Sequence, residues 1–410
     1  MKFDLVFEGG GAKGMVFVGA LEVFEGEGCE YERLLGTSAG AITATSLAAG
    51  YRSRELMEAL GEVEDGKPVF AKFMGEPAPF SEEEIRDSAI RAFLESVDLP
   101  LIPDFLEKRL DEKLVQTLAT QPRYRHLFSF IERGGWFGAD AFLAWMRRKL
   151  DEIYEKHRED GTIKAQPKPF GAMNLDEFYQ ATRRELSLVA ADITAQRMLV
   201  LNHYTAPQCP VVWATRMSMS VPLLWQEVVW QPEWGLYRDK DISGHAIVDG
   251  GLLSNFPIEL FISDDKHVAD VMGTGGAGKV LGFLIDESLT VEGAPEPEAS
   301  SGGFDFGSLQ TVQRLRQLLN TATMAHDRAV IEAFERLVVR LPAKGYGTTE
   351  FDMTVERQQA LLEAGRRTML RYFAEHPPGL EVEGDLSFGI GVAEEATSIA
   401  NRRATKILEW

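Results

Sequence analysis

The sequence predicts an α/β protein with a mainly parallel sheet, and three observations at its start support this fold class. Residues 3–8, "FDLVFE", are apolar enough to be a buried strand that runs into a group of glycines. Residues 15–26 then carry apolar positions at helical spacing. A second strand at Arg33–Leu35 leads into a second helix, and the order strand, helix, strand, helix is how a parallel α/β sheet begins.

The second helix covers "AITATSLAAG", and Gly50 is placed to end it as the residue after the last helical turn. Residues 51–185 are predicted to form a long, mostly helical insertion or cap. Inside this insertion, Ser81 and Glu84 have the spacing of a capping box, which predicts a helix that runs to about Leu94.

An apolar stripe at helical spacing follows later in the insertion. Its members are Phe142, Trp145, Met146, Leu150, Ile153 and Tyr154. A stripe of this kind packs against a protein core more often than against a membrane, so we expect a buried helix face.

Strands resume after the insertion. The segment 185–202 predicts a strand, a turn and another strand, and "HAIVDGG" and "KVLGFLIDE" predict two more. Residues 292–303, rich in proline, glycine and acid, form the clearest linker. Helices are predicted beyond it, over 308–340 and 354–375.

The chain therefore divides into three predicted parts. The main domain is 1–290, with the insertion inside it, and a linker follows at 291–307. A helical C-terminal region, 308–410, is expected to pack on the main domain. A length of 410 residues suits one large α/β domain with insertions.

The composition of the chain limits which binding partners and which cellular location we expect. The chain has 43 basic and 63 acidic residues, and a net charge of −20 repels nucleic acid, so no nucleic-acid partner is expected. The two cysteines, Cys29 and Cys209, make no disulfide framework and favour a cytoplasmic location. We expect no signal peptide at the N-terminus and no membrane span, because the sequence lacks the necessary apolar runs.

A glycine loop lies between the first strand and helix. Gly9, Gly10, Gly11 and Gly14, with Lys13, satisfy G-x-G-x-x-G, which is also the dinucleotide-binding fingerprint. That alternative needs an acidic residue at the end of the second strand, where the sequence has G-T-S instead. The backbone N–H groups of such a loop are also suited to binding a developing oxyanion.

The stretch "LLGTSAG" places Ser38 between Gly36 and Gly40, the spacing G-x-S-x-G. This motif marks a sharp turn that lifts a serine hydroxyl from the end of a strand. A serine hydroxyl becomes a good nucleophile only when a base takes its proton. The pairing of this turn with the glycine loop favours a serine hydrolase over a dinucleotide-binding protein.

A second glycine-rich stretch, "GTGGAGK" at 273–279, comes close to a phosphate-binding P-loop. Val280 stands where that motif needs Ser or Thr, and the following "VLGFLI" predicts a strand where the motif needs a helix. We therefore expect a flexible loop between strands.

The base that activates Ser38 has two candidate types. A Ser-His-Asp triad remains open, since triads are defined by geometry and seven histidines are available: His126, His157, His203, His245, His267, His326 and His376. The alternative is Asp249, which a predicted strand delivers to its end just before Gly250 and Gly251.

Taken in this order, the glycine loop, the serine turn and Asp249-Gly250-Gly251 resemble the patatin-like phospholipase family. Three further stretches are similar to parts of that family: "VAADIT", "ATRMSMSVP" and "GYGTTEFDMT". The resemblance implies a three-layer α/β/α fold with a mainly parallel central sheet and a helical insertion.

The resemblance also implies a Ser-Asp dyad without a histidine, with Ser38 as nucleophile and Asp249 as base. It needs no metal and no cofactor. The remaining implied site residues are Gly9, Gly10, Gly11, Lys13 and Gly14 for the oxyanion hole, Gly36 and Gly40 for the turn, and Gly250 and Gly251 beside the base.

The implied activity is hydrolysis of acyl esters of glycerophospholipids, of the phospholipase A or lysophospholipase type, through an acyl-enzyme. Alternatives are a soluble carboxylesterase or thioesterase on the same dyad, a latent effector that needs an activator, and a catalytically idle binding protein. The expected partner is a membrane phospholipid or another acyl ester, met by peripheral membrane contact. A homo-oligomer and a protein or small-molecule activator are left open.

One aromatic stretch suggests where lipid would be met. The segment "VPLLWQEVVWQPEWGLY", 221–237, contains Trp225, Trp230, Trp234 and Tyr237. Indole rings favour the interface of a membrane, but they also fill protein cores. Both interpretations are retained, with the core slightly favoured.

Overall fold

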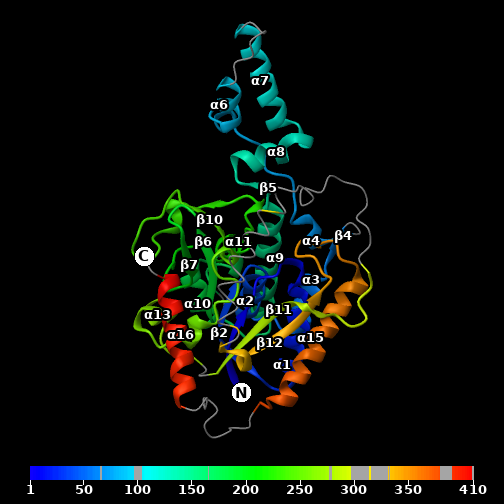
Figure 1. Ribbon diagram of the computed structural model, residues 1–410, viewed down its shortest axis with the longest axis vertical. Helices are drawn as coiled ribbons and strands as arrows, with labels where there is room; N and C mark the ends of the chain where they lie inside the picture. Colours follow the sequence, from blue (N-terminus) through cyan, green and yellow to red (C-terminus); the bar gives the residue numbers. More distant parts are fainter. Residues whose placement is uncertain are drawn as a thin grey trace.

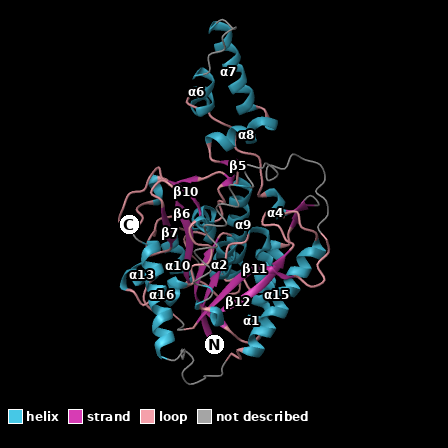
Figure 2. Cartoon of the chain, in the orientation of Figure 1, coloured by secondary structure: helices cyan, strands magenta, loops and turns pink. Residues whose placement is uncertain are grey.

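An eight-stranded sheet forms the centre of the molecule (Figures 1 and 2). It is seen in a computed structural model that describes residues 1–64, 67–96, 104–164, 166–276, 279–296, 314, 331, 333–378 and 390–408. Along the sheet the order is β12-β11-β1-β2-β6-β10-β9, and β7 pairs with β6 beside this path. The strands are β1 (Lys2–Phe7), β2 (Glu30–Thr37), β6 (Glu185–Asp192), β7 (Arg197–Leu201), β9 (Val228–Val229), β10 (Ala246–Asp249), β11 (Val280–Thr290) and β12 (Val338–Lys344).

Five neighbouring strands, from β12 through β11, β1 and β2 to β6, run parallel. Phe7 of β1 is in register with Gly36 of β2 and with Phe283 of β11. Strands β1 and β2 therefore reach their carboxyl ends together, whereas β11 continues beyond them to Thr290. The remaining strands β7, β9 and β10 are antiparallel to their partners. The mainly parallel α/β sheet predicted from the sequence is confirmed.

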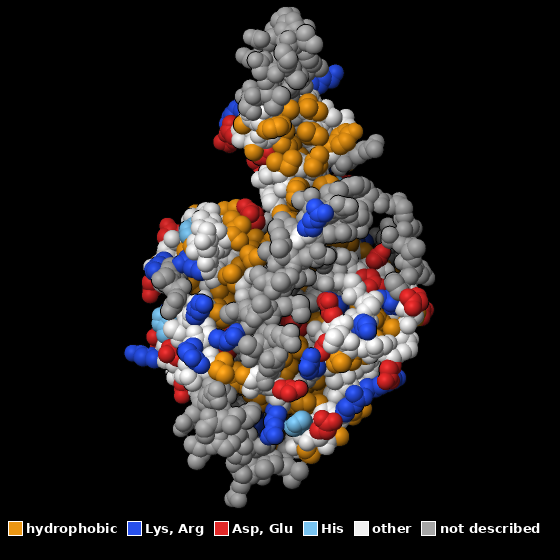
Figure 3. All heavy atoms as spheres, viewed as in Figure 1, with side chains coloured by type: hydrophobic (Ala, Val, Ile, Leu, Met, Phe, Trp, Pro, Cys, Tyr) orange, Lys and Arg blue, Asp and Glu red, His pale blue; other side chains and the backbone are white. Residues whose placement is uncertain are grey.

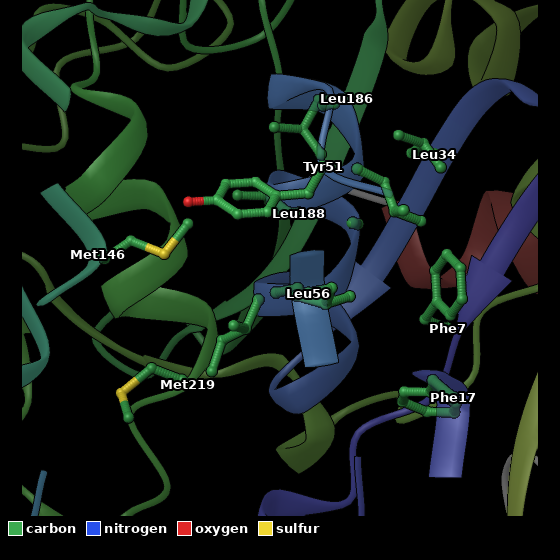
Figure 4. Packing of buried hydrophobic residues seen from close by; sticks show 14 of the residues in the cluster. Phe7, Phe17, Leu34, Tyr51, Leu56, Met146, Leu186, Leu188 and Met219 are labelled. Atoms are coloured by element: carbon green, nitrogen blue, oxygen red, sulfur yellow. The ribbon is translucent and has the colours of Figure 1, made fainter. Parts of the chain in front are cut away.

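Both faces of the sheet are buried, as parallel sheets require. In β1, Leu5 and Phe7 join one apolar cluster and Val6 joins a second cluster on the opposite face. Figure 4 shows the first cluster from close by, where Phe7 and Leu34 of the sheet lie in one apolar layer with Tyr51 and Met146. The alternating pattern of the strands therefore divides the core into two layers.

Helices cover each face and complete the three layers. On the first face lie α1 (Met15–Gly26), α2 (Ala39–Ala49), α3 (Ser53–Leu60), α9 (Asp140–Glu159), α10 (Leu175–Thr182), α11 (Val211–Ser218) and α15 (Val355–Glu375). On the second face lie α12 (Glu259–Ile262), α13 (Lys266–Met272) and α16 (Ile390–Leu408). The predicted stripe of α9, from Phe142 to Tyr154, is buried and belongs to the core.

The long segment between α2 and β6 has two kinds of structure. Helices α3, α9 and α10 pack on the core, with α4 (Val69–Lys72) beside α9 and a small hairpin of β3 (Val63–Glu64) and β4 (Lys67–Pro68). By contrast, α6 (Ala89–Ser96), α7 (Asp104–Thr120) and α8 (Pro122–Glu132) stand away from the body, and we call these three helices the arm (Figure 1).

At its base the arm joins the body through a two-stranded sheet. This sheet pairs β5 (Gly135–Phe137), which follows α8, with β8 (Leu223–Trp225) in parallel. The helix predicted from Ser81 to Leu94 is in two pieces. Ser81 does cap α5 (Glu82–Arg86) through the expected capping box, but this helix ends before Asp87, and α6 begins as a separate helix at Ala89. The Ser88 hydroxyl donates to the carbonyl of Ile85 and accepts the N–H of Arg91, so it ends one helix and starts the next.

Two other expectations are corrected in the second half of the chain. The helix predicted over 308–340 is wrong at its end, because Val338–Lys344 form edge strand β12, where β-branched residues pair with β11. Most of its remainder lies outside the described residues. The aromatic rings of the stretch 221–237 belong to the core: Trp225, Trp230, Trp234 and Tyr237 are all buried, and the lipid-facing interpretation of these rings is wrong.

The described helices are each too short or too polar to cross a bilayer. Of the glycine-rich stretch at 273–279, the described residues form the predicted loop, but it joins helix α13 to strand β11, so the expectation that it lies between two strands is wrong.

Candidate active site

Ser38 lies on a sharp turn between β2, which ends at Thr37, and α2, which begins at Ala39. Its backbone has φ 54° and ψ −118°, a strained conformation for a residue with a side chain. A Cβ on Gly36 would lie 2.3 Å from the carbonyl oxygen of Gly40, and a Cβ on Gly40 would lie 2.2 Å from that of Phe7. Only glycine fits at both positions, so the G-x-S-x-G spacing is needed to make this turn.

Helix α11 and the turn after it hold both candidate catalytic residues. The backbone N–H of Ser38 donates to Ser218 Oγ at 3.1 Å, and that hydroxyl donates to the carbonyl of Val189 at 2.6 Å. The backbone N–H of Asp249 donates to the carbonyl of Ser220 at 2.9 Å. The sequence marked this segment by similarity alone, and the positions of its hydroxyl groups became visible only in the fold.

Asp249 ends β10 and is 4% exposed. Its Oδ1 accepts the N–H of Gly251 at 2.8 Å, whereas Oδ2 is buried without a hydrogen-bond partner of ordinary geometry among the described residues. Burial raises the pKa of Asp249 to about 7, against smaller lowering effects from the Ser38 hydroxyl and the Gly251 N–H. Ser38 therefore lies next to a carboxyl with an unused oxygen and a pKa close to neutral, and catalytic hydrogen bonds are often loose before substrate binds.

The two glycines after Asp249 allow the backbone to pack closely around it. A Cβ on Gly250 would lie 2.5 Å from the carbonyl oxygen of Val189, and one on Gly251 would lie 2.8 Å from Asn255 Oδ1. Both positions thus favour glycine for reasons of space.

The glycine loop passes directly beside the nucleophile. A Cβ on Gly9 would lie 2.9 Å from Ser38 Cβ. Within the described structure, the backbone N–H groups of Gly10 and Gly11 donate to no acceptor, and neither does that of Ala39, the residue after Ser38. Three N–H groups on the two segments next to Ser38 are therefore available for an oxyanion, and sequence reasoning missed Ala39.

Gly9 and Lys13 make contacts that hold the glycine loop in place. The N–H of Gly9 donates to the carbonyl of Asn255 at 3.2 Å, so Gly9 is not an available oxyanion donor. The ammonium of Lys13 is bound to Glu287 and, at 3.0 Å, to Thr348 Oγ1, which ties the loop to β11 and to the segment before α15. Gly14 lets the loop lie against α2, since a Cβ there would be 3.1 Å from that of Ala39.

Asn255 is a second residue that the sequence analysis missed. Its Nδ2 donates to the carbonyl of Gly9 at 2.9 Å and to Glu8 Oε1 at 3.1 Å, and its backbone carbonyl accepts the Gly9 N–H. It joins the glycine loop to the segment that carries Asp249. The only available signal was a polar residue in "LLSNFP" shortly after the end of a predicted strand.

The described histidines have partners away from the dyad. His245 Nδ1 is 2.9 Å from Asp192 Oδ2, and His126 Nδ1 is 2.9 Å from the carbonyl of Trp136. His203 stacks on Tyr179, and burial lowers its pKa to about 4. His326 lies outside the described residues. Among the described histidines, none has a contact with Ser38 or Asp249 that would form a triad.

A serine on a strained turn at the carboxyl end of a parallel sheet, beside a buried carboxyl and unpaired N–H groups, has the layout of an α/β serine hydrolase. The model of the family described as patatin-like phospholipase matches residues 5–262. The chain belongs to this family, whose domain implies lipid acyl hydrolase activity.

Individual relatives are distant. Over 374 residues the chain is 27% identical to the uncharacterized protein YqhO of Bacillus subtilis, covering 90% of this chain and 96% of that one. Among solved structures, VipD from Legionella pneumophila matches with a TM-score of 0.46 and 17% identity, over 91% of this chain and 67% of VipD. The ExoU–SpcU complex of Pseudomonas aeruginosa matches with a TM-score of 0.40 and 13% identity, over 98% of this chain and 58% of the matched chain.

Proposed function

We propose that this protein hydrolyses acyl ester bonds of glycerophospholipids, as a phospholipase A or lysophospholipase, with Ser38 as nucleophile and Asp249 as base. The observation that carries the proposal is the unpaired, buried Oδ2 of Asp249 beside the strained Ser38, on a carboxyl whose pKa is raised to about 7. A carboxyl with such a pKa is partly ionised near neutral pH and still basic enough to take a proton.

The proposed reaction has two halves. Asp249 takes the proton of the Ser38 hydroxyl as Oγ attacks the ester carbonyl carbon, and the N–H groups of Gly10, Gly11 and Ala39 stabilise the resulting oxyanion. The ester C–O bond then breaks, and the leaving alcohol takes the proton from Asp249. In the second half, Asp249 takes a proton from water as the water oxygen attacks the carbonyl carbon of the acyl-enzyme. The bond between that carbon and Ser38 Oγ then breaks, Asp249 returns the proton to Oγ, and the fatty acid leaves.

A soluble carboxylesterase or thioesterase would use the same steps, so the substrates must be compared directly. The assay incubates the purified chain with mixed phospholipid vesicles, a short-chain soluble ester and an acyl thioester, and measures the released fatty acids by mass spectrometry. We expect release from phospholipid by wild type and none by Ser38→Ala. The matched control is Ser46→Ala, which changes a buried serine of α2, the helix that follows Ser38; its hydroxyl donates to the carbonyl of Ile42.

A fluorophosphonate probe should label wild type and Ser46→Ala but not Ser38→Ala. Persistent labelling of Ser38→Ala would assign the nucleophile to another residue. Hydrolysis of the thioester or soluble ester alone, with phospholipid untouched, would replace the proposed substrate by the soluble alternative.

We further propose a cytoplasmic enzyme that meets its substrate as a peripheral membrane protein. The support is the cysteine content, with Cys29 and Cys209 free and buried, and the lipid substrates of the family. Fractionation of cells into membrane and soluble parts tests this location.

A further inference from the structure

The arm carries apolar side chains that its own core does not use. That small core consists of Ile85, Ile90, Val115, Ala119 and Phe128. Outside it, Phe93 of α6 is 66% exposed and Leu114 of α7 is 45% exposed. Figure 3 shows hydrophobic side chains gathered on the arm over α8.

Helix α8 is apolar on two sides. Phe128 points into the arm's core and is fully buried, whereas Tyr124, Leu127 and Ile131 are 37%, 40% and 47% exposed. These three residues follow the spacing i, i+3, i+7, so they form one stripe along the helix. We call this stripe the α8 face. Exposed apolar stripes of this kind mark surfaces that bind another apolar body.

The charges of α8 fit a bilayer surface. Helix α8 contains Arg123 and Arg125 against one acidic residue, Glu132, although the whole chain has a net charge of −20. The Glu132 carboxylate accepts the N–H groups at the start of α6, and Arg125 lies 3.6 Å from Glu76. A segment that joins apolar residues to neutral or positive charge is suited to the interface of a phospholipid membrane.

Hydrogen bonds link the base of the arm to α11, the helix beside the candidate active site. The Ser129 hydroxyl of α8 donates to the carbonyl of Gly135 at 2.6 Å and accepts Nε2 of Gln226 at 2.8 Å. The carbonyl of Gln226 in turn accepts Nη2 of the buried Arg216 at 2.7 Å. Arg216 belongs to α11, the helix whose Ser218 holds the backbone of Ser38. Hydrogen bonds thus connect α8, through Gln226, to α11 and from there to the backbone of Ser38.

From the exposed stripe, its charge and its position, we propose that the α8 face docks on the surface of a phospholipid bilayer and brings Ser38 to membrane substrate. This rests on the proposed function for its purpose. The docking itself depends only on Tyr124, Leu127, Ile131 and their surroundings, so it is tested separately from catalysis.

The test uses the full chain carrying Ser38→Ala, so that vesicles stay intact, and phosphatidylcholine vesicles collected by sedimentation. The variant is Leu127→Gln with Ile131→Gln. The matched control is Val355→Gln with Leu370→Gln, which changes residues of α15 that are 57% and 53% exposed. We expect the α8 pair to weaken vesicle binding about tenfold or more, because roughly half the burial of two aliphatic side chains is lost. The control should bind as before.

On an active background, the α8 pair should lower hydrolysis of vesicles by a similar factor and leave hydrolysis of a short-chain soluble ester unchanged. Equal vesicle binding by the α8 pair and its parent would overturn the proposal, as would a parent that binds no vesicles. A parent that elutes as a dimer, separated into monomers by the α8 pair, would make the face a contact between copies of the chain instead. If wild type hydrolyses none of these esters, the proposed function is refuted, but the vesicle-binding measurement still decides whether the α8 face docks on a bilayer.

Discussion

Asp249→Asn is expected to remove activity while making the fold more stable at alkaline pH. Burial raises the pKa of Asp249 from 3.8 to about 7. Between these two pH values the folded protein keeps the proton and the unfolded chain releases it, so this group's contribution to stability falls as pH rises through the window. A gap of about three pH units corresponds to roughly 4 kcal/mol in the free energy of unfolding at full size.

Asparagine is neutral at every pH and escapes this penalty. We therefore expect wild type and variant to unfold alike near pH 4, with the variant becoming more stable up to about pH 7 and by roughly 4 kcal/mol at most above it. Urea unfolding followed by tryptophan fluorescence at pH 4.5 and pH 8 measures the difference. Asp352→Asn, at an exposed position, is the control and should show no such trend.

The activity of wild type should increase with pH, whereas its stability decreases. The ionised fraction of a group with a pKa of about 7 increases from about 9% at pH 6 to about 91% at pH 8, so wild-type kcat/KM should increase about tenfold over this range. The variant should lose about 10²–10⁴-fold at pH 8. A stability difference that is the same at both pH values, or a wild-type rate that is flat from pH 5 to pH 8, would refute a desolvated Asp249 base.

Three further changes test the surroundings of the dyad. Gly11→Ala should lower kcat and cost about 1–3 kcal/mol of stability, because Gly11 has φ +58° and a Cβ there would lie 2.1 Å from the carbonyl oxygen of Thr348. Gly26→Ala, at a position with open space around it, is the control. An unchanged kcat of Gly11→Ala would contradict the role of the glycine loop in catalysis. Ser218→Ala leaves the Ser38 N–H without its acceptor and should lower kcat about fivefold with KM unchanged, for a loss of about 1 kcal/mol of transition-state stabilisation. A change in KM alone would assign Ser218 to substrate binding. Trp230→Ala should cost about 3–5 kcal/mol of stability and reduce hydrolysis of vesicles and soluble ester equally, since the ring is fully buried; a loss confined to vesicles would restore the lipid-facing interpretation of 221–237.

The sequence by itself determined the elements whose signals are local. Glycines with no room for a side chain mark the turn at Ser38 and the close packing after Asp249, and the predicted helix 15–26 has the same bounds in the fold. Gly50 ends α2 in the left-handed conformation that favours glycine. These features depend on neighbours a few residues apart, so a motif is enough to predict them.

Tertiary structure decided what depends on residues distant in sequence. In sequence, Gly9 cannot be distinguished from the other glycines of the loop. In the fold, its N–H donates to the backbone carbonyl of Asn255, 246 positions away in sequence. The aromatic residues at 221–237 suited either a membrane or, slightly better, a core, and only the side chains packed against them in the fold decided that they are core. The stripe on α8 shows the reverse case. The sequence analysis assigned no role to its apolar residues, and the arm is too small to cover both sides of the helix. Burial is a property of what surrounds a residue rather than of the residue itself.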